Sequence, residues 1–226
     1  MKKLQYLIVA LPVIACLSSL VSCTDSKKAS LADDEFLITG QLNGNKGDSA
    51  LLFLVPMEGP HPRPVDSVYV GADGAFEFRG NVEQMAVLRL AWRQRMGTQE
   101  LLVVTEPGVT YVTLDSISSA YGTPQNDALQ QWKEFREASS RELSRIGSMR
   151  RQPGYDKAEA EALTDSLRQA INDYNYDFLK GLGRQTLSVF LMKMVGGGLD
   201  SIRRAELNEL LVDTVDYTQP QPGFRR

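Results

Sequence analysis

Residues 65–79, VDSVYVGADGAFEFR, contain the clearest structural signal of the sequence, a predicted β-hairpin. Asp73-Gly74 lies between two alternating segments and supplies the positive-φ positions that a tight turn requires. After the turn, Phe76 and Phe78 alternate with charged residues, so that one face of the second strand is apolar. The stretch therefore predicts two antiparallel strands that cover a hydrophobic core with one face.

Short segments of the same kind occur throughout residues 35–121. They are rich in β-branched, aliphatic and aromatic residues, and turn residues separate them. Besides the hairpin, the expected strands are Phe36–Leu42, Ala50–Val55, Met85–Trp92, Glu100–Thr105 and Val109–Leu114. Six or seven strands at a spacing of roughly ten residues predict a small antiparallel β-sandwich or open barrel.

The hydrophobic period becomes helical in residues 122–212. Residues 127–148 and 156–180 each carry one apolar stripe, and Asp156 with Glu159 resembles a capping box. The stripes consist of Leu129, Trp132, Phe135, Leu143 and Ile146, and of Leu163, Leu167, Ile171, Tyr174 and Phe178. They predict an antiparallel helical hairpin. Two short helices, Thr186–Val195 and Ser201–Leu211, and a disordered tail at 213–226 are expected to follow. The expected fold class is α+β, with the β part first.

The first 22 residues have the three-part pattern of a secretory signal. Lys2 and Lys3 form a positive n-region, and a mainly apolar segment extends from Leu4 to Leu17. This apolar run is shorter than the roughly 20 residues that a helix needs to span a bilayer. We therefore expect residues 1–22 to be a signal peptide, and an uncleaved anchor is the alternative.

The end of this segment predicts a lipid anchor. Leu20-Val21-Ser22-Cys23 resembles a lipobox, an aliphatic residue and two smaller ones before a cysteine whose thiol receives diacylglycerol. Two or three acyl chains such as palmitate form a durable anchor, because each buried CH₂ contributes ~0.8 kcal/mol. The alternative is an ordinary secretory signal with a chance cysteine. Residues 23–34 are expected to be the lipidated cysteine and a flexible tether.

The expected location is the envelope of a Gram-negative bacterium, on the outer membrane rather than the inner one. Asp33-Asp34-Glu35 is either the solvated end of the tether or part of a sorting signal. The net charge of −3 and the lack of a basic block argue against a nucleic-acid partner. The expected partners are the membrane, through the anchor, and an envelope protein or a small ligand.

Residues that could carry chemistry are few. The only histidine, His61, lies between two prolines and cannot by itself form a metal site or a catalytic dyad. Trp92 between Arg93 and Arg95 is either a strand-end aromatic or a platform for a stacked ligand. Gly196-Gly197-Gly198 is interpreted as a helix stop, since it lacks the context of a phosphate loop. No catalytic, metal or cofactor-binding residue is expected, although carboxylate pairs remain open.

The β part resembles a domain-of-unknown-function family found at the N-terminus of bacterial lipoproteins. The matching motifs are Phe36-x-Ile38-x-Gly40, Val65-Asp66-Ser67, Asp73-Gly74-x-Phe76-x-Phe78-x-Gly80, Glu106-Pro107-Gly108 and Gly122-Thr123-x-x-Asn126, within residues 35–126. Many members of the family continue into a thioredoxin-like domain of the AhpC/TSA or TlpA-like type. Such a domain needs a Cys-x-x-Cys, and this chain has no cysteine after Cys23. It therefore resembles the N-terminal module alone.

Three functions are compatible with the sequence. The first is a non-catalytic lipoprotein whose folded part binds a ligand or a partner protein. The second is an accessory or truncated relative of thiol-disulfide oxidoreductase lipoproteins, without a dithiol of its own. The third is a hydrolase with an unrecognised carboxylate site. A flat apolar patch would favour the first, and a deep pocket with converging acids would favour the third.

Overall fold

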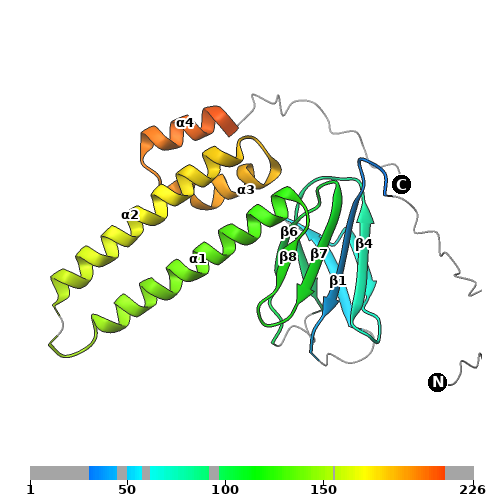
Figure 1. Ribbon diagram of the computed structural model, residues 1–226, viewed down its shortest axis with the longest axis horizontal. Coiled ribbons are helices and arrows are strands. Elements are labelled where there is room, and N and C mark those ends of the chain that lie inside the picture. Colours follow the sequence, from blue (N-terminus) through cyan, green and yellow to red (C-terminus); the bar gives the residue numbers. More distant parts are fainter. Residues whose placement is uncertain (1–30, 45–49, 58–61, 92–96, 155, 212–226) are drawn as a thin grey trace, which may run out of the picture. The chain divides into compact units, whose positions relative to one another are not determined.

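Eight strands are followed by four α-helices in the computed structural model, which describes residues 31–44, 50–57, 62–91, 97–154 and 156–211 (Figure 1). All of these elements belong to one compact unit, Leu31–Arg226. Cys23, the signal peptide and the predicted tail at 213–226 lie outside the described residues. Within the described part, no helix is both long enough and apolar enough to cross a membrane.

The strands form two four-stranded sheets that pack face to face as a sandwich, with no closed barrel. One sheet has the order β4 (Ala75–Gly80), β1 (Phe36–Leu42), β7 (Gly108–Leu114) and β8 (Ser119–Tyr121). The other has the order β3 (Asp66–Tyr69), β2 (Leu51–Pro56), β5 (Met85–Leu90) and β6 (Leu101–Val104). Side chains from both sheets share one buried cluster, which includes Ile38, Phe78, Leu52 and Leu88. The predicted fold class, a β part followed by an α part, is confirmed.

Two strand pairings differ from the expectation. The segments predicted as a hairpin form strands and are joined by a tight turn with Gly74 at φ 85°, but β3 pairs with β2 and β4 pairs with β1. The turn is thus a corner between the sheets. In addition, β1 and β7 run parallel, so the module is not wholly antiparallel. Alternation indicates which side chains face the core, but it contains no information about the direction or identity of the neighbouring strand.

Two glycines explain the Phe-x-Phe-x-Gly and Phe-x-Ile-x-Gly motifs. In the β1–β4 register, Gly40 is paired with Phe76 and Gly80 with Phe36. A Cβ atom on Gly40 would lie 2.6 Å from the Phe76 ring, and one on Gly80 would lie 2.8 Å from the Phe36 ring. Each phenylalanine therefore lies over a glycine of the other strand, which fixes the register of the pair.

The helices are α1 (Pro124–Met149), α2 (Lys157–Leu182), α3 (Thr186–Val195) and α4 (Ser201–Leu211). Asp156 is the N-cap of α2, as predicted, and its side chain accepts a hydrogen bond from Ala158 N. The predicted capping box with Glu159 is not formed, since the bond goes to Ala158 N instead of Glu159 N. After α3, Gly196–Gly198 forms one turn of 3₁₀ helix, so the predicted helix stop at Val195 is confirmed. The Arg204 guanidinium donates to the carbonyl oxygens of Gly196, Gly197 and Leu199 and thereby caps this end.

A second buried cluster lies where the four helices meet the sandwich. Trp132 is 3% exposed and packs there with Met85 and Val104 of the sheet and with leucines of α1, α2, α3 and α4. The Phe135 ring stacks on the Tyr174 ring, at 3.5 Å between centroids. Leu163, near the tip of the hairpin, is 41% exposed and contributes little to this core. Trp132 is therefore a core residue, Tyr174 and Phe178 of α2 pack against the same cluster, and Phe135 is partly buried against Tyr174.

Candidate functional site

A buried carboxylate joins the sandwich to the first helix. Glu106 follows β6 and is 6% exposed, and its Oε1 accepts hydrogen bonds from Gln125 N at 2.7 Å and Asn126 N at 3.1 Å. These N–H groups belong to the first turn of α1, where no helical carbonyl is available to them. A negative charge at a helix N-terminus is also favoured by the helix dipole. Glu106 therefore sets the point at which α1 leaves the sandwich.

Asn126 completes the edge of the second sheet. Its Oδ1 accepts from Val104 N at 2.9 Å, and its Nδ2 donates to Val104 O at 2.8 Å. The amide thus bonds both backbone groups of one residue of β6, as a neighbouring strand would. The Nδ2 also lies 2.8 Å from Thr123 Oγ1 and 3.2 Å from Thr110 Oγ1. Asn126 is fully buried, and both ends of its amide are hydrogen-bonded.

Gln125 extends these contacts to α3. Its Oε1 accepts from Leu187 N at 2.9 Å, and its Nε2 donates to Glu83 Oε1 at 2.9 Å. Glu83 Oε1 also accepts from Thr186 Oγ1 at 2.6 Å. We call Glu83, Glu106, Gln125, Asn126 and Thr186 the polar joint. The joint connects the sandwich to both α1 and α3 and fixes the space between them.

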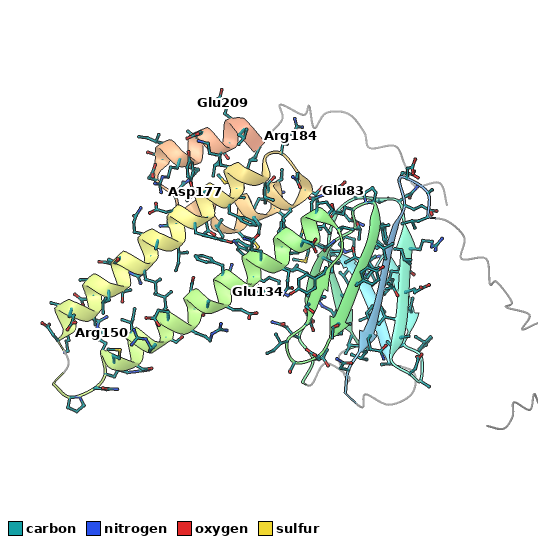
Figure 2. The ribbon with its side chains drawn as sticks, viewed as in Figure 1. Glu83, Glu134, Arg150, Asp177, Arg184 and Glu209 are labelled. Carbon is teal, nitrogen blue, oxygen red and sulfur yellow. The ribbon has the colours of Figure 1, made fainter. Side chains whose placement is uncertain are left out.

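A pocket of about 820 Å³ lies beside the polar joint, between α3 and the end of the sandwich where β2 stops and β5 starts. Its apolar lining comes from Met57 and from Val189, Phe190 and Met194. Among the described residues, its charged lining consists of Glu83, Arg184 and Lys193. Glu83 and Arg184 are labelled in Figure 2, close to the junction between the helices and the strands. The volume falls within the usual range for small-molecule sites, ~300–1,000 Å³.

A second polar group fastens α4 to α2. Lys180 Nζ and Tyr176 Oη both donate to Glu206, at 2.7 and 2.6 Å, and Arg203 is bonded to Asp173. The hydrogen bond from Lys180 lowers the pKa of Glu206, and the hydrogen bond from Arg203 lowers the pKa of Asp173. The Tyr176 ring lies about 5 Å from both cations. Because these groups are solvent-exposed and pair with one another, their arrangement indicates helix packing rather than a reactive site.

The residues singled out in the sequence separate into two groups. Cys23, His61 and the segment from Trp92 to Arg95 lie outside the described residues. The Glu106-Pro107-Gly108 and Gly122-Thr123-x-x-Asn126 motifs come together at the polar joint. Over the described ranges, no three His, Cys, Asp or Glu side chains are placed to hold a metal ion.

The pocket itself could not be recognised from the sequence. Its lining comes from the end of β2, the start of β5 and α3, which are far apart in the chain. The partial signal was the polar first turn of α1, Pro124-Gln125-Asn126-Asp127, since a fully buried amide at such a position requires specific partners.

The fold and the polar joint define the class of the protein. It is a β-sandwich domain in which the buried carboxylate of Glu106 and the amide of Asn126 hold the first helix, α1, to the sandwich. Residues 36–129 match the family model of a domain of unknown function (DUF4369). The predicted resemblance over residues 35–126 is therefore confirmed as a match to a domain of unknown function. The match ends in the second turn of α1, just after Gln125 and Asn126. Neither the curated proteins nor the solved structures yield a match to this chain.

Proposed function

We propose that the protein is a lipoprotein of the bacterial cell envelope, anchored to the outer membrane by lipid on Cys23. The observation that carries this proposal is Leu20-Val21-Ser22-Cys23 at the end of a short apolar segment that two lysines precede. The tether from Thr24 to Asp34 is rich in polar and small residues, as expected between a lipid and a folded domain.

We further propose that the folded part binds a ligand or a partner protein and does not catalyse a reaction. The pocket beside α3 supports this role, since it combines an apolar wall with a few charged groups, as ligand sites do. Among the described lining residues, Glu83 is the one acid and accepts hydrogen bonds from Gln125 and Thr186, so this described lining has no pair of converging carboxylates of the kind that glycoside hydrolysis uses.

The anchor is tested by replacing Cys23 with serine in the full chain. The Cys23→Ser protein should move from the membrane fraction to the soluble fraction and should lose labelling by a fatty-acid probe. The matched control is Cys16→Ser, which changes the other cysteine of the sequence, within the predicted signal peptide, and should leave both readouts unchanged. Membrane retention and labelling of the Cys23→Ser protein equal to those of the unaltered chain would refute the anchor.

A further inference from the structure

A second pocket, of about 270 Å³, lies between the two long helices α1 and α2. Figure 1 shows these helices side by side, with the loop that joins them far from the sandwich. The apolar lining of the pocket includes Phe135 and Leu143 of α1, Ile171 of α2 and Val195 at the end of α3. We call it the hairpin pocket, and none of its described lining residues also lines the pocket beside α3.

A buried side-chain amide offers an unused donor to the hairpin pocket. Asn175 lines the pocket and is 7% exposed, and its Oδ1 accepts a hydrogen bond from Trp132 Nε1 at 3.1 Å. Because an indole N–H can only donate, this bond fixes the orientation of the amide and leaves Nδ2 for the pocket. Among the described residues, no group accepts a hydrogen bond from Asn175 Nδ2 or from the hydroxyl of Ser139, a lining residue that is 9% exposed. Since buried polar groups normally have a partner, these two donors favour a ligand that carries acceptors.

The charge of the hairpin pocket favours an anion. Arg136 is the one charged residue among the described lining residues. Its guanidinium lies over the Trp132 ring, 5.2 Å from the centroid, and this contact holds the cation beside the pocket. No carboxylate in the described part of the chain forms an ion pair with Arg136. One guanidinium with neutral donors matches a carboxylate, which carries a single charge and accepts paired N–H bonds from arginine.

The volume of the hairpin pocket limits the rest of the ligand. A cavity of about 150 Å³ can hold benzene. About 270 Å³ therefore leaves room for a group of that size together with a carboxylate. The apolar lining would remove such a group from water.

From these observations we propose that the hairpin pocket binds a small monocarboxylate with an apolar body about the size of a phenyl ring. Its carboxylate accepts hydrogen bonds from Arg136, Ser139 and Asn175, and its body packs against Phe135 and Ile171. This site goes beyond the proposed function, because it depends on neither the lipid anchor nor the pocket beside α3.

Calorimetric titration with hydrocinnamate, a phenyl ring on a propionate, tests the ligand class. The full chain is titrated in a neutral detergent, and the detergent alone is the blank. Hydrocinnamate should bind at least about fivefold more tightly than hydrocinnamamide, which has the same body without the charge. Acetate, which has the charge without the body, should not bind measurably. Absence of hydrocinnamate binding, or equal affinity for the amide, would overturn the proposal.

Two matched pairs of variants locate the ligand. Arg136→Gln removes the cation and should weaken hydrocinnamate binding at least about fivefold, whereas Arg141→Gln, at an exposed arginine of α1 outside the described lining, should leave it unchanged. Ser139→Leu places a larger side chain in the pocket and should weaken binding at least about tenfold, and Ser144→Leu, at an exposed serine of the same helix, should not.

A cooperative melting transition shows that each variant is folded. Arg136 is exposed, so Arg136→Gln decides the question even if Ser139→Leu does not fold. Binding by Arg136→Gln as tight as that of the unaltered chain would place the ligand elsewhere and overturn the proposal. Because the titration does not depend on lipid at Cys23, its failure leaves the anchor standing, and loss of the anchor leaves the hairpin pocket standing.

Discussion

At the scale of single residues, Asn126 carries the tightest set of constraints in the described part of the chain. It is fully buried, it bonds both backbone groups of Val104, and it lies next to the carboxylate of Glu106. From the sequence, the motif Gly122-Thr123-x-x-Asn126 was recognised only as a turn before the helices. The role of Asn126 depends on a β6 edge that lies 22 residues earlier in the chain, and spacing along the sequence does not contain that proximity.

We predict that Asn126→Asp destabilises the protein by about 3 kcal/mol. The substitution keeps the shape of the side chain but replaces the Nδ2 donor by an acceptor that faces Val104 O and two threonine hydroxyl groups. A buried polar group left without its partner costs ~1–3 kcal/mol, and a buried charge costs more. The free energy of unfolding from urea titration measures the effect.

The control for this substitution is Asn81→Asp, at an exposed asparagine. It should change the free energy of unfolding by less than about 0.5 kcal/mol. If Asn126→Asp cost no more than the control, the polar joint would not hold α1 to the sandwich.

At the scale of elements, the sequence predicted the type and bounds of the helices better than the partners of the strands. α3 and α4 begin and end at the predicted residues, because Gly196–Gly198 interrupts the apolar period between the two helices. The three-residue strand β8 was missed, since so short a segment has no measurable alternation. The β3–β4 turn was recognised correctly, but its strands belong to different sheets. A tight turn specifies that the chain reverses, and long-range packing decides which strands pair.

The helical core gives the prediction at this scale. Trp132→Ala removes a side chain that is 3% exposed and contacts residues of the helical cluster, so it should cost ~3–5 kcal/mol. The melting temperature should fall by roughly 10 °C. Trp132→Phe keeps most of the packing but removes the hydrogen bond from Nε1 to Asn175 Oδ1, and it should cost ~1–2 kcal/mol.

Thermal unfolding followed by circular dichroism measures both changes. Tyr69→Ala is the control, because Tyr69 is 72% exposed on the edge strand β3. A melting temperature of Trp132→Ala within a degree or two of the unaltered protein would contradict the packing. Trp132 would then be a candidate contact for a partner protein.

At the scale of the whole molecule, the proposed anchor and tether join a folded unit that contains a pocket. The match of residues 36–129 to a domain of unknown function covers the sandwich and the motifs of the polar joint. The pocket also needs α3, which lies beyond that match and which the joint holds in place through Thr186 and Leu187. The binding role that we propose is therefore a property of the sandwich and the helices together.

The proposed lipid on Cys23 is tested most directly by mass spectrometry of the N-terminal peptide. Protein extracted from membranes of the producing bacterium should begin at Cys23, and the mass of its first peptide should include diacylglycerol on the thiol. Alkaline hydrolysis should remove the ester-linked acyl chains and lower the mass accordingly. An N-terminal peptide that retains Leu20-Val21-Ser22 before an unmodified Cys23, or that begins after Cys23, would contradict the lipid anchor.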